Sequence, residues 1–204
     1  MFFGYGLNSV VFALFAAGTA VLLGAPPRAK TVLEALERYQ VNVLFSVPTI
    51  LKLMFAAWPD TGLQLPHLRL CISAGETLPA SLYALALDRF GVEIIDGIGT
   101  TEVLSTFIST RQGESRANCT GLVVPGFEVR LVNEQGDTCV VGESGSLWVR
   151  GNSLTEGIYG DPVLTRQVFN DGWFNTKDMF YMDAGGQFHY VGRANDVLLS
   201  LIHI

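Results

Sequence analysis

The fold of this chain is decided by Asp96-Gly97-Ile98-Gly99-Thr100-Thr101-Glu102, which directly follows the apolar run Val92-Glu93-Ile94-Ile95. A β-branched run before a glycine turn predicts a strand whose end lets backbone approach a ligand, because glycine has no Cβ. Thr100 and Thr101 can donate hydrogen bonds to phosphate oxygens, and Glu102 can bind Mg²⁺ beside them. Taken alone, the stretch is equally typical of an ordinary junction of strand, turn and helix, with Glu in the first helical turn.

The composition bounds the class of protein. The chain has 204 residues, enough for one core or two small ones, and is 49% hydrophobic and only 16% charged. This balance predicts either a membrane protein or a globular piece of a larger body whose contact surfaces are exposed. The net charge of −6, without a Lys/Arg cluster, argues against a nucleic-acid partner. Three cysteines without CxxC spacing predict buried, reduced thiols of a cytosolic protein: Cys71, Cys119 and Cys139.

Residues 1–23 contain no charged side chain. A signal peptide is disfavoured because no basic segment precedes the apolar stretch. A membrane-spanning helix is disfavoured because glycine, asparagine, serine and threonine interrupt the stretch and no basic flank precedes it. We expect instead a buried helix over 7–17 and a buried strand over 20–23, with Gly18 between them, and the membrane interpretation stays open as the alternative.

The first half of the chain alternates helices with short apolar strands. Apolar residues at helical spacing, and prolines at helix starts, predict helices over 31–39, 48–58 and 79–90. Strands are predicted over 41–45, 68–72 and 92–95. This alternation predicts an α/β fold with a doubly wound, mostly parallel sheet. Ligands of such sheets bind beyond the carboxyl ends of the strands, here at 73–76 and 96–102.

After Gly121, glycines separate short strands, which predicts a β-rich subdomain. We expect strands over 127–132 and 145–150, and a hairpin of 180–182 with 187–191. One helix is predicted over 162–169, with Asp161 as its N-cap. The chain is therefore expected to divide into an α/β subdomain over 1–120 and a β-rich subdomain over 121–192.

Other kinds of chemistry find little support. The chain has no G-x-S-x-G nucleophile elbow, no HExxH or Cys/His zinc cluster, and no G-x-x-x-x-G-K-[ST] phosphate loop. Its histidines, His67, His189 and His203, form no recognisable pair of nucleophile and base. Four segments remain: Ser73-Ala74-Gly75-Glu76-Thr77-Leu78-Pro79, the stretch from Asp96 to Glu102, Gly172-Trp173-Phe174-Asn175-Thr176-Lys177-Asp178 and Gly192-Arg193-Ala194-Asn195-Asp196.

These four segments, in this order and spacing, resemble the motifs of the adenylate-forming superfamily, which includes acyl-CoA synthetases, luciferases and the adenylation domains of peptide synthetases. A fifth motif of the family is similar to residues 142–151 followed by 157–162. Within the superfamily, Phe2-Phe3-Gly4-Tyr5-Gly6-Leu7 and Asp96-Gly97-Ile98-Gly99 look most like the benzoate–CoA ligase group. The resemblance implies that the chain is part of the large N-terminal domain of such an enzyme.

The resemblance also implies a reaction in two steps that uses ATP, Mg²⁺ and coenzyme A. A carboxylate, here of an aromatic acid such as benzoate, attacks the α-phosphate of ATP, which gives an acyl-adenylate and pyrophosphate. The thiol of coenzyme A then displaces AMP and forms a thioester. An enzyme of this kind is expected in the cytoplasm, with a small carboxylic acid as its partner and neither nucleic acid nor a membrane span.

By position in the motifs, the resemblance assigns a nucleotide site. Thr101 would hydrogen-bond the α-phosphate, Glu102 would bind Mg²⁺, and these two would act in catalysis. Asp178 would accept hydrogen bonds from the ribose hydroxyls, because a carboxylate suits two O–H donors. Arg193 would reach the ribose or a phosphate. The other nucleotide-binding positions are Gly75, Glu76 and Thr77, which would line the adenine through their backbone, and Asp96, Gly97 and Thr100.

The resemblance implies the acyl pocket at three positions. Tyr5 stands at an aromatic position of the family, although it is as typical of a core residue. Ser105 or Thr106 stands at the substrate-facing position after the Mg²⁺ glutamate. Benzoate-type enzymes usually have a histidine where this chain has Ser105, so the smaller hydroxyl would accept a substituted ring or a different acid.

Departures from the family pattern bear on activity. The Ser/Thr/Gly-rich loop with its phosphate-binding lysine is not among the 204 residues, nor is the C-terminal domain with its lysine for adenylation. Because such cations stabilise charge that develops in the transition state, we expect this chain alone to form no acyl-adenylate. Lys177 replaces the glycine before Asp178, and Asn195 replaces the hinge aspartate. Residues 193–204 are expected to be a truncated hinge with a tail that leaves the family motif, as in a truncated reading frame.

Three functions stay open on the sequence. The first is a fragment of an aromatic carboxylate–CoA ligase whose parent is active. The second is a non-catalytic module that binds an adenine nucleotide or an acyl-adenylate. The third is an adenylation domain that serves a carrier protein, which differs from the first only in the acceptor thiol.

Overall fold

The computed structural model of the chain describes residues 4–21, 23–24, 28–58 and 62–194. The chain divides into two compact units, one of residues 1–97 and 110–118 and the other of residues 98–109 and 119–204. Residues 98–109, 119 and 120 are expected from the sequence in the first subdomain but belong to the second unit. The predicted Asn195 hinge and the tail that follows it lie outside the described residues.

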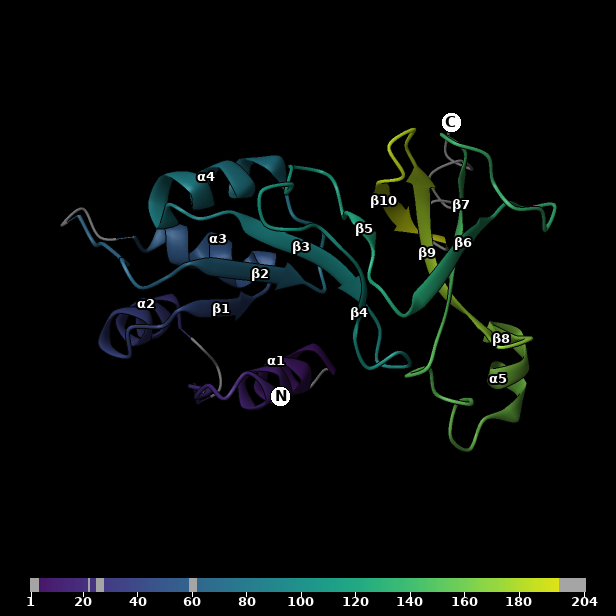
Figure 1. Cartoon of the computed structure of the whole chain (residues 1–204), viewed down its shortest axis with the longest axis horizontal. Coiled ribbons are helices and arrows are strands. Elements are labelled where there is room, and N and C mark those ends of the chain that lie inside the picture. Colours follow the sequence, from purple (N-terminus) through teal and green to yellow (C-terminus); the bar gives the residue numbers. More distant parts are fainter. Residues whose placement is uncertain (1–3, 22, 25–27, 59–61, 195–204) are drawn as a thin grey trace. The chain divides into compact units, whose positions relative to one another are not determined.

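The first unit has an α/β architecture (Figure 1). Its strands are parallel neighbours in the order β1-β2-β3, and helices follow β1 and β2, so the predicted parallel sheet is confirmed. The elements of this unit are α1 (Gly4–Phe15), α2 (Ala29–Arg38), β1 (Val43–Ser46), α3 (Pro48–Ala56), β2 (Leu70–Ala74), α4 (Ala80–Phe90) and the first part of β3 (Ile94–Gly99).

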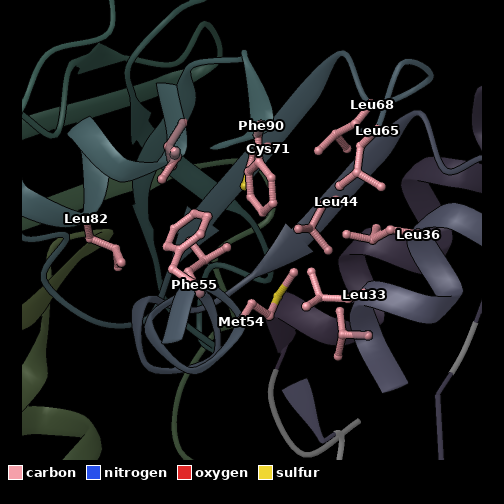
Figure 2. Packing of buried hydrophobic residues seen from close by; sticks show 14 of the residues in the cluster. Leu33, Leu36, Leu44, Met54, Phe55, Leu65, Leu68, Cys71, Leu82 and Phe90 are labelled. Atoms are coloured by element: carbon pink, nitrogen blue, oxygen red, sulfur yellow. The ribbon is translucent and has the colours of Figure 1, made fainter. Parts of the chain in front are cut away.

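Helices cover both faces of this sheet. The register places Leu44 of β1 beside Cys71 of β2, and both are buried among apolar side chains of α2, α3 and α4 (Figure 2). The next residue of β1, Phe45, points to the opposite face, because side chains alternate along a strand. There it contacts Tyr5 and Phe12 of α1, with ring centroids 6.2 and 6.0 Å apart. This two-sided cover is what a doubly wound sheet requires.

The second unit is rich in antiparallel strands (Figure 1). Its main sheet has the order β10-β9-β7-β6, with β8 beside β9, while β4 pairs with β5. Leu147 and Val149 of β7 and Phe180 of β9 are fully buried in its core. The elements are β4 (Thr106–Ser109), β5 (Leu122–Val123), β6 (Phe127–Val132), β7 (Ser144–Gly151), α5 (Pro162–Val168), β8 (Phe169–Asn170), β9 (Trp173–Met182) and β10 (Phe188–Arg193).

Two local features of this unit follow from the sequence. The predicted N-cap of α5 is confirmed, since the carboxylate of Asp161 accepts a hydrogen bond from the N–H of Leu164 at 2.8 Å. Asp171 and Gly172 form a two-residue turn between β8 and β9, with φ of +50° and +75°. Such a turn needs positive φ at both positions, for which Asp-Gly is a favoured pair.

The prediction of a strand over 20–23 is wrong. Residues 20, 21 and 23 lie in no strand, and residue 22 lies outside the described residues. Helix α1 ends in a tight turn in which the N–H of Ala17 donates to the carbonyl of Leu14 and the N–H of Gly18 donates to that of Ala13. Four apolar residues alone do not separate a strand from irregular backbone packed on a core. Among the residues described, no helix combines the length and the apolar character needed to cross a bilayer.

Candidate functional site

Three polar residues form a row near the carboxyl ends of the strands of the first unit. The register pairs Ser46 with Ser73 and Ser73 with Asp96. Ser73 has no exposed surface, and its Oγ has no hydrogen-bond partner among the described residues. Burial raises the pKa of Asp96 from 3.8 to about 7, although a hydrogen bond from the backbone of Gly97 lowers it in part. The edge where α/β sheets bind ligands thus carries a carboxyl group that titrates near neutral pH.

The loop after β2 carries the predicted adenine-binding residues, all three of them exposed. It begins with Gly75, whose φ of +85° lies in the left-handed region that favours glycine. One carboxylate oxygen of Glu76 accepts hydrogen bonds from the backbone N–H and the hydroxyl of Thr49, at 2.9 and 2.6 Å. Thr49 lies in the first turn of α3. The side chain of Glu76 therefore faces this helix, which leaves the backbone of the loop as the part that a ligand can contact.

Tyr5, a predicted acyl-pocket residue, is tied to the sheet of the same unit. Its hydroxyl donates to the carbonyl of Ile72 at 2.9 Å and to that of Ser46 at 3.2 Å. Burial raises the pKa of this phenol above its ordinary value. The one proton of the hydroxyl is shared between two backbone acceptors, so the hydroxyl cannot donate to a ligand without breaking a bond to the sheet.

In the second unit, the residues after β3 carry the predicted phosphate and Mg²⁺ groups. They form a turn that leads into β4, not the helix of the alternative interpretation. The N–H of Leu104 donates to the carbonyl of Thr101 at 3.1 Å, and the N–H of Val103 donates to the hydroxyl of Thr100 at 3.3 Å. Thr100 thus acts within the turn, whereas Thr101 is exposed and Glu102 is half-buried.

Gly99 is required by a close approach within this turn. An ideal Cβ on Gly99 would lie 2.5 Å from the carbonyl oxygen of Ser105 and 3.2 Å from the Cα of Thr106. The segment that packs closely against Gly99 is therefore the chain's own backbone at Ser105 and Thr106, the two residues predicted to face the acyl group. The carbonyl of Glu102 also accepts a hydrogen bond from the N–H of Thr155 at 2.8 Å, which ties the turn to the loop after β7.

Asp178 lies on a bulge in β9. The register pairs Ser146 with Met179 and Trp148 with Asn175, so two steps along β7 match four along β9. Lys177, at the centre of the bulge, has a φ of +63°, a conformation that favours glycine. Bulges of this kind redirect a side chain and are frequent beside functional sites.

The bulge places the carboxylate of Asp178 against Arg193 of β10. The atoms Oδ1 of Asp178 and Nη1 of Arg193 are 3.2 Å apart, and Arg193 also donates to the carbonyl of Thr176 at 3.2 Å. The Asp178 side chain is 6% exposed, while that of Arg193 is 59% exposed. Burial raises the pKa of Asp178, and the Arg193 guanidinium and a hydrogen bond from Thr176 lower it in part. A buried carboxylate accepts hydrogen bonds but donates none, so it suits a ligand with hydroxyl donors.

Residues 1–159 match the family model described as AMP-binding enzyme. The chain belongs to this family. It is 37% identical to the benzoate–CoA ligase of Thauera aromatica over 201 residues, which are 97% of this chain and 38% of that protein. It is 39% identical to the anthranilate–CoA ligase of Pseudomonas aeruginosa over 199 residues, again 97% of this chain and 38% of the relative.

The chain is also similar in fold to solved structures of aromatic acid CoA ligases. The anthranilate CoA ligase AuaEII, in complex with anthranoyl-AMP, matches 96% of this chain with a TM-score of 0.91 and 34% identity. A benzoate CoA ligase from Burkholderia xenovorans matches 95% of it with a TM-score of 0.88 and 33% identity. The matched parts are 38% and 40% of those chains, so the chain spans well under half the length of either.

The described residues of this chain can bind Mg²⁺ only together with a ligand that supplies further oxygen atoms. Within the part of the chain that the structure describes, no three His, Cys, Asp or Glu side chains gather closely enough to hold a metal ion. Mg²⁺ in nucleotide-using enzymes is commonly held by one or two carboxylates together with phosphate oxygens of the substrate. A single carboxylate such as Glu102 fits that arrangement, in which the nucleotide completes the coordination.

Two sets of contacts were not predicted from the sequence. Thr49 contacts Glu76 from 27 positions away, and its only local signal is its place beside Pro48 at a predicted helix start. The guanidinium carbon of Arg130 on β6 lies 5.4 Å from the ring centroid of Trp148 on β7 and 4.4 Å from that of Trp173 on β9. Strand alternation places Arg130 and Trp148 on one face, but their pairing depends on the register.

Proposed function

We propose that this chain is part of an ATP-dependent ligase that joins an aromatic carboxylic acid to coenzyme A through an acyl-adenylate. Family membership and the benzoate and anthranilate ligases among its relatives support this proposal. The structural observation that carries it is the buried carboxylate of Asp178, which a bulge presents beside an exposed arginine. This arrangement suits the two hydroxyls of a ribose next to the negative charge of a phosphate.

The reaction proceeds in two displacements. An oxygen of the aromatic carboxylate forms a bond to the α-phosphorus of ATP, and the bond from that phosphorus to the bridging oxygen breaks as pyrophosphate leaves. The sulfur of coenzyme A then loses its proton to solvent and forms a bond to the acyl carbon, and the bond from that carbon to the phosphate oxygen breaks as AMP leaves. Thr101 donates to an α-phosphate oxygen and Glu102 holds Mg²⁺, which when bound offsets phosphate charge. Asp178 accepts from the ribose, and the Arg193 guanidinium favours the charged form of that carboxylate against the effect of burial.

The remaining positions complete the proposal. The backbone of 75–77 lines the adenine. Asp96, Gly97 and Thr100 are the other residues that bind the nucleotide. The ring of Tyr5 and the residues Ser105 and Thr106 line the aromatic acid, and Asn195 is the hinge to a further domain. A ligase that consumes ATP and coenzyme A is expected in the cytoplasm, where both are supplied.

Calorimetric titration with benzoyl-sulfamoyl-adenosine, a non-hydrolysable mimic of the acyl-adenylate, tests the nucleotide site in the 204-residue chain. Asp178→Asn keeps the size of the side chain but removes its charge, so we expect affinity to fall by about tenfold or more. Asp88→Asn, an exposed aspartate on α4, is the matched control and should leave affinity unchanged. Equal affinity of the wild type and Asp178→Asn would contradict the ribose assignment.

A chimera tests the catalytic proposal. In it, this chain replaces the matching 201 residues of the Thauera aromatica benzoate–CoA ligase. We expect the chimera to release pyrophosphate with benzoate or a substituted benzoate, whereas the 204-residue chain alone releases none. A folded chimera that binds the mimic but adenylates no aromatic acid would favour a non-catalytic binding module instead.

A further inference from the structure

Glu76 caps a helix to which it does not belong. Helix α3 begins after Val47, whose backbone has the extended conformation of an N-cap but whose side chain has no polar atom. The first N–H groups of a helix have no partner within it and need an acceptor from outside. Glu76 supplies this acceptor to Thr49, with bonds of 2.9 Å to its N–H and 2.6 Å to its hydroxyl. Its negative charge at this end also complements the helix dipole.

The same bonds fix the middle of the loop after β2. Ala74 and Leu78 are buried and anchor the two ends of this loop. Between them, Gly75, Glu76 and Thr77 are all exposed, and Gly75 has the widest backbone freedom of any residue type. A carboxylate held by two donors on a rigid helix restricts this short segment at its centre.

We propose that Glu76 is a positioning residue: by binding Thr49 it holds the backbone of 75–77 in the shape that receives the adenine ring. This inference rests on the proposed function, because it takes the nucleotide to contact this loop. The side chain itself touches α3 and not the ligand. Its effect on binding is therefore preorganisation, since a loop that is already ordered loses less entropy when the ligand arrives.

Substitutions separate this role from simple helix capping. Glu76→Ala removes both bonds, so we expect the dissociation constant of benzoyl-sulfamoyl-adenosine for the 204-residue chain to rise about fivefold to tenfold. Glu76→Gln keeps an acceptor oxygen and should recover most of the affinity. Adding Val47→Ser to Glu76→Ala gives α3 a cap of its own. We expect this double variant to regain the thermal midpoint of the wild type but not its affinity.

Hydrogen exchange without ligand tests whether Glu76 orders the loop, independently of any binding measurement. Amide hydrogen exchange of residues 75–78 should accelerate in Glu76→Ala and stay fast in the double variant with Val47→Ser. In the chimera, Glu76→Ala should raise KM for ATP and leave kcat nearly unchanged, as expected when binding alone is weakened.

Either of two results would overturn the positioning role. One is unchanged affinity in Glu76→Ala, and the other is full recovery of affinity and slow exchange when Val47→Ser restores the cap. A wild-type chain that does not bind the mimic would instead contradict the proposed function. The exchange of residues 75–78 would then still show whether Glu76 tethers the loop.

Discussion

Replacing Lys177 with glycine should stabilise the chain. Lys177 has a φ of +63°, and this left-handed conformation costs a residue with a Cβ about 1–2 kcal/mol. Glycine removes that cost but has more freedom in the unfolded chain, which returns about 0.5–1 kcal/mol. The side chain of Lys177 is exposed, and its N–H keeps the bond of 2.9 Å to the Oδ1 of Asn175 in the variant. We therefore expect the free energy of unfolding to rise by about 0.5–1 kcal/mol.

Urea unfolding followed by tryptophan fluorescence measures this change, and the thermal midpoint should rise by roughly 1–4 °C. Lys177→Ala is the matched control, because it removes the charge but keeps the Cβ and should leave stability nearly unchanged. Lys52→Gly, at an exposed position of α3, should lower stability by about 1 kcal/mol, as glycine does inside a helix. If Lys177→Gly destabilises the chain, or Lys177→Ala stabilises it equally, the backbone of Lys177 is not strained.

Three further substitutions test the raised pKa of Asp96, the close packing at Gly99 and the helix cap at Asp161. The pKa of Asp96 is raised from 3.8 to about 7, so the folded chain holds this proton more tightly and loses stability as pH rises through that interval. In urea titrations, Asp96→Asn should therefore exceed the wild type in stability at pH 8 and approach it near pH 4; parallel pH profiles would refute the burial argument. Gly99→Ala brings a Cβ within 2.5 Å of the Ser105 carbonyl and should cost about 1–3 kcal/mol, which scanning calorimetry detects. Asp161→Ala should cost about 1 kcal/mol in urea unfolding, whereas Asp161→Asn keeps the capping oxygen and most of the stability.

Helices and strands of this chain were predictable where a pattern repeats over many residues. The apolar spacing of α2 to α4 and the alternation in β6 and β7 each specify a period, and the observed elements lie within a few residues of the predicted ones. The two-residue β5 and the apolar residues after α1 are too short to show a period. The turn after β3 was ambiguous for the same reason, since one Glu near a glycine is typical of a helix start and of a turn.

The site was predictable as a set of residues but not as a set of contacts. The sequence analysis expects a glycine where this chain has Lys177, but the positive φ of this residue on a bulge is a property of the register between β7 and β9. The bond between Thr49 and Glu76 likewise joins distant positions, which no local spacing predicts. Contacts of this kind depend on how strands pair, and a shift of one residue would turn each side chain to the other face.

Three acids of the candidate site show what the structure adds. In the sequence, Glu76, Asp96 and Asp178 are equivalent carboxylates, each within one of the motif segments. In the structure, Glu76 is exposed and bound to Thr49, Asp96 is half-buried with a pKa of about 7, and Asp178 is buried beside Arg193. Since a carboxyl group near its pKa can donate as well as accept, Asp96 can serve either kind of partner at neutral pH. Burial raises the pKa of Asp178 and the Arg193 guanidinium lowers it in part, so the charged form, which only accepts hydrogen bonds, has a cation beside it. In our proposals Asp178 therefore accepts from two hydroxyl donors, whereas Glu76 acts on the loop and not on the ligand.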